Sequence, residues 1–444
     1  MLKSRLCIAF FAFAVGCAPA QKPLTDYVNP MLGTATLWDS VDLGFKPTKR
    51  TWGAEVFPGS SLPNAMVQVS PVTKFHSGAG YQYEDSVIYG FTHTNKGHWN
   101  LCHIPLLPVT GTPTPGDYCS PFSHERESAA PGYYQVFLDR YGVDAQLSST
   151  LRCAFHKYTY PAGAAPAVLA DLQRSNEHVR AWDIRKEGDN VFAGWQQTGE
   201  KMYFYAVANR PVTGIEPVVE GDREVRIVRF GEGDGALELR IGFSFVSEKN
   251  ARENLEAEML GKSFAEVRSE ATATWNDLLG RIRVEGGTER EKGLFYSSLY
   301  RSFLWPALRS DVNGEFTDVD GKVINPGFRY YTGPSYWDDY RNKLILLGML
   351  APDVAADVIS SDTDKGEKRG GFMPTFFHGD HASAFVAGTY LRGNRGFDVN
   401  RAYNLVLRNA TVQGPSRPWL DEYVAKGYIS EMDVENPVTW TVCK

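Results

Sequence analysis

The stretch that decides the fold class is Leu237-Glu238-Leu239-Arg240-Ile241-Gly242-Phe243-Ser244-Phe245. Every second residue is apolar, which predicts a β-strand with one buried face. Residues 224–227 alternate in the same way, and the glycines between positions 231 and 235 supply a turn between the two runs. Short runs of this kind, separated by glycine and proline, continue back to about residue 26 and predict an antiparallel β-sandwich.

After about residue 250 the apolar residues recur at steps of three and four, as an amphipathic helix requires. The residues that share this helical face are Leu260, Phe264, Val267, Ala271, Trp275 and Leu278. Further helices are predicted over residues 290–305, 335–349, 352–361, 382–392, 398–412 and 419–426. A complete toroid of six helical hairpins needs about twelve helices, and the sequence predicts roughly half of them.

The chain of 444 residues is therefore expected to contain four segments. We predict a signal peptide over residues 1–20, a β-sandwich over 24–248 and a linker helix over 249–284. An incomplete (α/α)6 toroid is expected over residues 285–444, which makes the protein a β + α multidomain chain.

The N-terminus has the layout of an export signal. Lys3 and Arg5 precede an apolar run over residues 6–15, and Ala18-Pro19-Ala20 forms a small-residue cleavage site. Two processing routes remain open, namely cleavage after Ala20 or lipidation of Cys17 within an imperfect lipoprotein box. The chain is expected to be exported to the periplasm, the outer membrane or the medium, with membrane attachment only through a lipid on Cys17.

Composition and motifs exclude several function classes. The formal charge of −6, without a basic cluster, argues against nucleic acid as a partner. With 43% hydrophobic and 22% charged residues, the chain has the composition of a globular protein. It contains no nucleophile elbow, phosphate-binding loop or His-Glu-x-x-His zinc motif.

Two stretches in the first half combine turn formers, aromatic residues and polar groups. The first, Phe57-Pro58-Gly59-Ser60-Ser61-Leu62-Pro63, is interpreted either as a tight turn or as a loop lining a ligand cleft. The second spans residues 91–100. There His93 and His98 are too poorly spaced for a metal pair, so hydrogen bonding to sugar hydroxyls is favoured, with Trp99 as an apolar platform.

Two further stretches lie in the second half. In Tyr336-Trp337-Asp338-Asp339-Tyr340-Arg341, Asp338 and Arg341 are expected on one helix face beside Trp337, and substrate contact is favoured for Asp338. The alternative is a helix cap formed with Ser335. In Gly379-Asp380-His381, a role in the cleft competes with a helix cap for Asp380 and a buried position for His381.

Taken in order, these motifs resemble glycoside hydrolase family 92, a family of exo-acting, calcium-dependent α-mannosidases. The agreement covers roughly residues 27–428, and it is carried by the following stretches: Val28-Asn29-Pro30-Met31-Leu32-Gly33-Thr34, Phe57-Pro58-Gly59, Gly90-Phe91-Thr92-His93-Thr94, Pro131-Gly132-Tyr133-Tyr134, Phe295-Tyr296-Ser297-Ser298-Leu299-Tyr300, Tyr336-Trp337-Asp338-Asp339-Tyr340-Arg341 and Gly379-Asp380-His381-Ala382.

The resemblance implies a sandwich packed on an (α/α)6 toroid, with the active site between them. It implies that Trp337 and Asp338 hold the terminal mannose, that Phe57 walls the pocket and that Trp99 lies toward the leaving sugar. Members of the family invert configuration with a Glu acid and an Asp base, assisted by Ca²⁺. The similarity fades after Gly427-Tyr428-Ile429, so neither the acid and base nor the calcium ligands are expected in this chain.

The function expected from this resemblance is that of a secreted α-mannosidase, exo-acting, inverting and of α-1,2 type on mannose-rich glycans. Because the catalytic segment is expected to be missing, the chain is predicted to be inactive alone. The alternative is a non-catalytic protein that binds mannose-containing glycans. Lyases or phosphorylases with the same architecture are a third, weaker interpretation.

Overall fold

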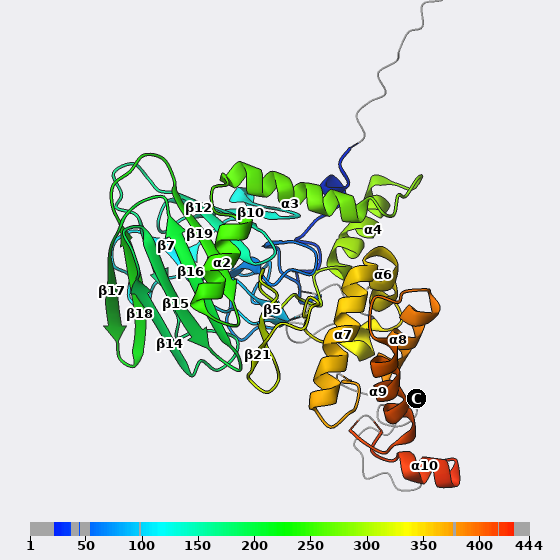
Figure 1. The fold of residues 1–444 in the computed structure, drawn as a ribbon. Coiled ribbons are helices and arrows are strands. Elements are labelled where there is room, and N and C mark those ends of the chain that lie inside the picture. Colours follow the sequence, from blue (N-terminus) through cyan, green and yellow to red (C-terminus); the bar gives the residue numbers. More distant parts are fainter. Residues whose placement is uncertain are drawn as a thin grey trace, which may run out of the picture.

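The computed structural model describes residues 22–36, 44, 54–96, 99–375, 379–415 and 417–429. The β-sheets form one half of the molecule and the helices that follow α3 form the other (Figure 1). This arrangement confirms the predicted N-terminal antiparallel sandwich and the helical domain that follows it. The predicted signal peptide and Cys17 lie outside the described residues.

Two antiparallel sheets form the N-terminal half. The seven-stranded sheet contains, in spatial order, β1 (Ser60–Ser61), β2 (Gln68–Val72), β4 (Gly90–Thr92), β7 (Leu106–Val109), β13 (Ala167–Ala170), β18 (Arg223–Phe230) and β17 (Val212–Glu220). The eight-stranded sheet contains β14 (Ala181–Lys186), β15 (Val191–Gln197), β16 (Lys201–Ala208), β19 (Leu237–Ser244), β12 (Cys153–Thr159), β11 (Val143–Ser149), β10 (Tyr133–Leu138) and β9 (Glu127–Ala130).

Smaller elements decorate the two sheets. Three two-stranded ribbons pair β3 (Val87–Ile88) with β8 (Ser120–Pro121), β5 (Asn95–Lys96) with β6 (Trp99–Asn100), and β20 (Phe316–Thr317) with β21 (Val323–Ile324). Two short 3-10 helices are η1 (Leu24–Tyr27) and η2 (His124–Arg126). The β5–β6 ribbon lies at the side of the sandwich that faces the helical half (Figure 1).

Strand β19 has the predicted alternation. Leu237, Leu239 and Ile241 are fully buried, whereas Glu238 and Arg240 pair with each other at 3.1 Å on the outer face. Helix α2 (Glu248–Glu258) packs directly on this face at Gly242. A Cβ atom at that position would lie 2.1 Å from the Ala251 carbonyl oxygen, so the close approach of helix to strand requires glycine.

The helices after α2 are α3 (Phe264–Leu279), α4 (Glu289–Ser302), α5 (Tyr336–Asp339), α6 (Lys343–Leu350), α7 (Pro352–Lys368), α8 (His381–Leu391), α9 (Val399–Thr411) and α10 (Leu420–Lys426). Where one linker helix was expected over residues 249–284, the chain turns between α2 and α3. Gly261 adopts a φ of 91° there, and Ser263 with Glu266 forms a capping box that restarts the helix. The helix expected over residues 335–349 is likewise divided into α5 and α6.

The two halves are joined through the segment of residues 303–311. Asn64, from the sandwich, donates from its backbone N–H to the Phe303 carbonyl at 2.6 Å and from its side-chain amide to the Pro306 carbonyl at 2.8 Å. At the other end of the segment, the buried Asp311 carboxylate accepts hydrogen bonds from Ser244, Asn250 and Asn254 at 2.7, 2.9 and 2.6 Å. These contacts fix the helical half against strand β19 and helix α2.

Within the part of the chain that the structure describes, no single helix is both long and apolar enough to cross a membrane. Helices α6 and α7 meet that requirement only when taken together, and they are bent by 119° at their junction.

We expect Asp311→Ala to lower the free energy of unfolding by about 3 kcal/mol, because three buried donors lose their acceptor. Urea denaturation measures this loss, and Asp320→Ala, an exposed aspartate of the same region, is the matched control. The control should stay within about 0.5 kcal/mol of the wild type. Equal losses in the two variants would contradict the assigned role of Asp311.

Candidate functional site

A cavity of about 210 Å³ lies where the sandwich meets the helical half. Its walls come from the loop before β1, the end of α4, the segment after α4, and α5 with the start of α6. The lining residues are Val56, Phe57, Arg301, Leu304, Trp305, Ser335, Asp338, Asp339 and Lys343. Residues far apart in the sequence therefore share one pocket, which is the usual location of ligand sites in two-domain proteins.

The stretch that begins at Phe57 forms a wall of the pocket and leads into a turn at Pro63-Asn64. Phe57 is 2% exposed, and a Cβ atom at Gly59 would lie 2.1 Å from the Val69 carbonyl oxygen, which explains the glycine after Pro58. Phe57 lines the cavity, and the role that the resemblance implies for it stays a prediction. Both interpretations of this stretch are therefore compatible with its position.

Arg301 holds that loop in place and was not singled out from the sequence. Its guanidinium donates to the Phe57 carbonyl at 3.3 Å, to the Pro30 carbonyl at 2.5 Å and to the Leu32 carbonyl at 2.9 Å. Burial lowers the pKa of Arg301 to about 10. Arg301 directly follows the Phe295–Tyr300 motif. That motif is the feature of the sequence from which Arg301 could have been nominated.

The carboxylates of Asp338 and Asp339 have different partners. Asp338 accepts a hydrogen bond from the Ser335 hydroxyl, which is the contact that the helix-cap alternative expected. Its side chain is also exposed and lines the cavity. Asp339 is buried and pairs with Lys343 at 3.1 Å. Burial raises the pKa of Asp339, while the Lys343 ammonium opposes that shift. Asp338 is thus the pocket carboxylate available to a ligand.

The cation beside these carboxylates is Lys343 and not the expected Arg341. Helix α5 is only four residues long, and Arg341 lies in the turn that follows its C-cap, Tyr340. Arg341 instead packs over the Tyr340 ring at 4.9 Å. Lys343 begins α6 and lines the cavity. Trp337 is half-buried on α5, while Trp305 supplies the indole among the cavity-lining residues.

Asp380 and His381 lie behind the pocket. Asp380 is the N-cap of α8, where it accepts from the Ser383 hydroxyl at 2.6 Å and from Asn409 at 3.1 Å. His381 is buried, and its ring stacks on Tyr340 with centroids 4.1 Å apart. Neither residue lines the cavity. Their positions correspond to the structural alternatives, a helix cap and a packed histidine, and they support the end of α5.

His93 lies inside the sandwich and not at a sugar-binding surface. It is fully buried, and its Nε2 atom is 3.0 Å from the Nε2 atom of His156, so one ring donates and the other accepts. The ring also packs on Phe243 at 4.5 Å. Burial lowers the pKa of His93 to about 3 and holds the pKa of His156 well below its ordinary value. Both rings are therefore neutral at physiological pH.

The other two residues of the 91–100 stretch that were expected to contact sugar, His98 and Trp99, belong to the β5–β6 ribbon and its connection. His98 lies outside the described residues, and Trp99 is described only through the backbone of β6. The sugar contacts expected of these two side chains stay predictions.

No three histidine, cysteine or acidic side chains gather as a metal site within the described ranges.

A small pocket between two domains, lined from both halves by an aromatic ring, a carboxylate and cations, is a typical site for a small polar ligand. Two family descriptions match the chain, namely Glycosyl hydrolase family 92 N-terminal domain over residues 27–253 and Glycosyl hydrolase family 92 catalytic domain over residues 250–443. The chain therefore belongs to glycosyl hydrolase family 92, which confirms the resemblance seen in its motifs. The catalytic-domain match runs to residue 443, past Ile429, where the similarity was expected to fade.

Solved structures and a curated relative agree with this assignment. A family 92 α-mannosidase from Bacteroides thetaiotaomicron is 25% identical with a TM-score of 0.81, covering 91% of this chain and 58% of its own. An inverting mannosidase from the same species is 24% identical with a TM-score of 0.81, at 94% and 60% coverage. An uncharacterized secreted glycosidase of Arthroderma benhamiae is 24% identical over 470 residues. The chain spans 56% of that relative's length.

The buried histidine pair predicts a pH dependence of stability. The unfolded pKa of His93 is about 6.5, above its folded value of about 3. As the pH falls through this window, the unfolded chain takes up a proton that the folded chain does not bind. His93 therefore makes the free energy of unfolding fall with decreasing pH, by up to about 1.4 kcal/mol per pH unit.

Denaturant titrations between about pH 7 and pH 4 measure this dependence. The variant His93→Phe should be less stable at neutral pH, because His156 loses its partner, and should lose stability less steeply on acidification. His76→Gln changes an exposed histidine and should keep the wild-type slope. An unchanged slope in His93→Phe would show that His93 does not carry the effect.

Proposed function

We propose that this chain forms the mannose-binding side of an exported, exo-acting, inverting α-mannosidase of α-1,2 type that acts on mannose-rich glycans. The observation that carries the proposal is the pocket shared by Phe57, Asp338 and Lys343. Membership of family 92 and the likeness to α-mannosidase structures support the substrate class. A related α-mannosidase structure contains mannoimidazole, which supports a mannose-like ligand.

The size and chemistry of the pocket suit one terminal sugar. A volume of about 210 Å³ is below the range of about 300–1,000 Å³ typical of drug-sized ligands. The exposed Asp338 carboxylate can accept hydrogen bonds from two sugar hydroxyls, and charge-assisted bonds of this kind are strong. The Lys343 ammonium donates to Asp339 and retains two further N–H groups for hydroxyl oxygens. Phe57 and Trp305 provide apolar walls.

The same pocket supports binding without hydrolysis by the chain alone. Inversion requires a carboxylic acid and a carboxylate base about 6.5–9.5 Å apart. This separation leaves room for the water that the base activates beside the sugar. The carboxylates among the cavity-lining residues are Asp338 and Asp339, which are adjacent in sequence. Asp339 is already neutralised by Lys343, so Asp338 has no free carboxylate partner among these residues.

Export is part of the proposal. The basic start, apolar run and small-residue site of the first twenty residues support it. The name of the curated relative, a secreted glycosidase, is consistent with it. Free secretion and a lipid on Cys17 remain the two routes.

Binding is tested by calorimetry with mannose and methyl α-mannoside. We expect Asp338→Asn to weaken binding by about tenfold or more, because a charge-assisted hydrogen bond becomes a neutral one. Asp353→Asn changes an exposed aspartate in the first turn of α7 and serves as the matched control. Binding that is equal in the wild type and Asp338→Asn would refute the proposed sugar contact.

Hydrolysis is tested separately with α-1,2-, α-1,3- and α-1,6-linked mannobioses in the presence of calcium. We expect the purified chain to bind these glycans and to release no mannose. A non-catalytic glycan-binding protein would also bind these glycans without turnover. Tighter binding of the α-1,2-linked mannobiose is therefore the outcome that favours a pocket of the α-1,2-mannosidase type. Turnover at the rates of ordinary glycosidases would refute the claim of binding without hydrolysis.

A further inference from the structure

A second cavity lies on the outer face of the sandwich, where helix α3 packs beside strands β11 and β12 (Figure 1). One wall comes from these two strands, and the other comes from the residues of α3 between Phe264 and Asn276. Its volume of about 640 Å³ is within the range of about 300–1,000 Å³ typical of small-ligand sites. We name this cavity the α3 groove. Among the described residues, none lines both the groove and the pocket between the two halves.

Two cations of the groove are held over aromatic rings. Lys157 Nζ lies 5.7 Å from the centre of the Phe264 ring, and the Arg268 guanidinium lies 3.6 Å from the centre of the Tyr133 ring. The two rings touch edge to face, with their centres 6.2 Å apart. Cation–ring attraction therefore holds both side chains against one aromatic floor. This attraction does not use up their N–H groups, which donate to oxygen acceptors.

The acids on the strands beside Lys157 pair with other groups. The cross-strand neighbours of Lys157 are Gln146 on β11 and Glu238 on β19. Glu238 pairs with Arg240 at 3.1 Å. Asp144, the acid two residues from Gln146, accepts hydrogen bonds from side-chain amides at 2.7 and 2.9 Å. Within the described part of the chain, Lys157 therefore has no ion-pair partner.

Arg268 lacks the partner that helical spacing often provides. The residues three and four positions away from it are Phe264, Ala265, Ala271 and Thr272. An ion pair along a helix needs an acid at one of these positions. Arg252, on the neighbouring helix α2, shows the contrast, because it lies over the Tyr205 ring at 5.8 Å and also pairs with Glu256 at 2.7 Å. Among the described residues, Arg268 has no such ion pair.

The acids of α3 on either side of Arg268 are engaged outside the groove. Glu266 accepts from the Ser263 hydroxyl at 2.7 Å, and Glu270 pairs with Lys262 at 2.6 Å. None of the described residues that line the groove is an aspartate or a glutamate. The groove is therefore locally positive, although the whole chain carries a formal charge of −6. A local field of this sign attracts anions.

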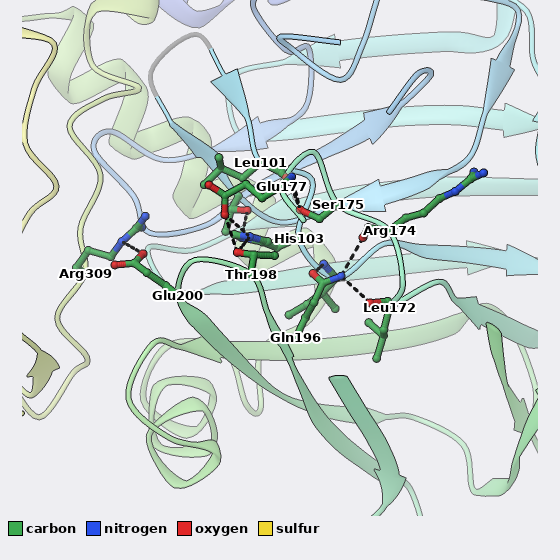
Figure 2. Close-up of polar contacts among 12 residues, drawn as sticks. Leu101, His103, Leu172, Arg174, Ser175, Glu177, Gln196, Thr198, Glu200 and Arg309 are labelled. Atoms are coloured by element: carbon green, nitrogen blue, oxygen red, sulfur yellow. Dashed lines mark hydrogen bonds and ion pairs between the residues drawn. The ribbon is translucent and has the colours of Figure 1, made fainter. Parts of the chain in front are cut away.

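Polar side chains elsewhere on the sandwich have partners within the protein (Figure 2). Glu177 accepts from the Thr198 hydroxyl at 2.6 Å, and His103 Nε2 lies 3.0 Å from the same hydroxyl. Gln196 donates to the Leu172 carbonyl at 2.9 Å. The two cations of the α3 groove have no comparable partner in the described ranges, so their charges are available to a ligand.

We propose that the α3 groove binds an anionic sugar, meaning a sugar residue that carries a carboxylate or a phosphate group. The planar Arg268 guanidinium matches the paired oxygens of either group, and the Lys157 ammonium adds a second charge. The Ser269 hydroxyl and the Gln146 amide are suited to sugar hydroxyls, and Phe264 supplies apolar surface beside them. The groove is separate from the mannose pocket, so this inference goes beyond the proposed function.

The proposal is tested by calorimetry at low ionic strength with glucuronate, glucose 6-phosphate and, as the neutral reference, glucose. We expect at least one anionic sugar to bind and glucose to show no binding at the same concentrations. The tighter of the two anionic sugars identifies the anionic group. Lys157→Gln and Arg268→Gln should each weaken its binding by about tenfold, because one charge-assisted contact is lost. Arg252→Gln, which removes the ion-paired arginine of α2, should leave the affinity unchanged.

A charge of the opposite sign provides a second test. Ser269 is exposed and lines the groove, so Ser269→Glu should place a carboxylate beside the two cations and abolish binding. Thr274→Glu adds the same charge at an exposed position of α3 outside the lining residues. It should weaken binding by less than about twofold, because solvent screens a distant charge. Thermal unfolding checks that every variant is folded.

The outcomes separate the groove from a general charge effect and from the mannose pocket. Absence of binding by both anionic sugars, or unchanged affinity in both Lys157→Gln and Arg268→Gln, would overturn the site. Equal weakening by Ser269→Glu and Thr274→Glu would show a response to net charge alone and would also overturn it. Inorganic phosphate that binds as tightly as the sugars would rule out a sugar as the ligand. In Asp338→Asn the binding of the anionic sugar should persist, which distinguishes failure of the groove from failure of the pocket.

Discussion

The structure depends on the buried hydrogen bonds that hold residues 303–311 against the sandwich. Asn64 secures one end of this segment through Phe303 and Pro306, and Asp311 secures the other end through three donors. A buried carboxylate is stable only when its acceptor sites are filled, so this end of the segment has essentially one low-energy position. Trp305 lies between these anchors and lines the cavity, so the geometry of the cavity depends on them.

The pocket follows from this attachment. Arg301 ties the Phe57 loop to α4, while the ion pair of Asp339 with Lys343 neutralises the buried side of α5. Asp338 is left exposed as the acceptor. A binding site made this way is rigid, because its walls are held by buried bonds that do not involve the ligand. The junction therefore brings an apolar wall, an acceptor and a donor together in one pocket.

Local chemistry explains where prediction from the sequence was sufficient. The alternation in β19 and the switch to helical spacing after residue 250 are short-range patterns, and the elements formed where they indicated. The division of two expected helices has local causes as well, since Gly261 turns the chain before the capping box of α3. For Asp338 and Asp380, a helix-capping pattern and a ligand role gave the same sequence signal. Asp338 lines the cavity and Asp380 does not, and this difference depends on segments that are distant in sequence.

The sequence by itself determined the order of the two halves, the family and the nomination of Phe57 and Asp338, because periodicity and ordered motifs are properties of the linear chain. The tertiary structure decided that His93 pairs with His156 in the core and that Arg301 sets the Phe57 wall. The physical reason is that burial and charge pairing depend on which distant segments meet. No pattern within a short stretch of sequence contains that information.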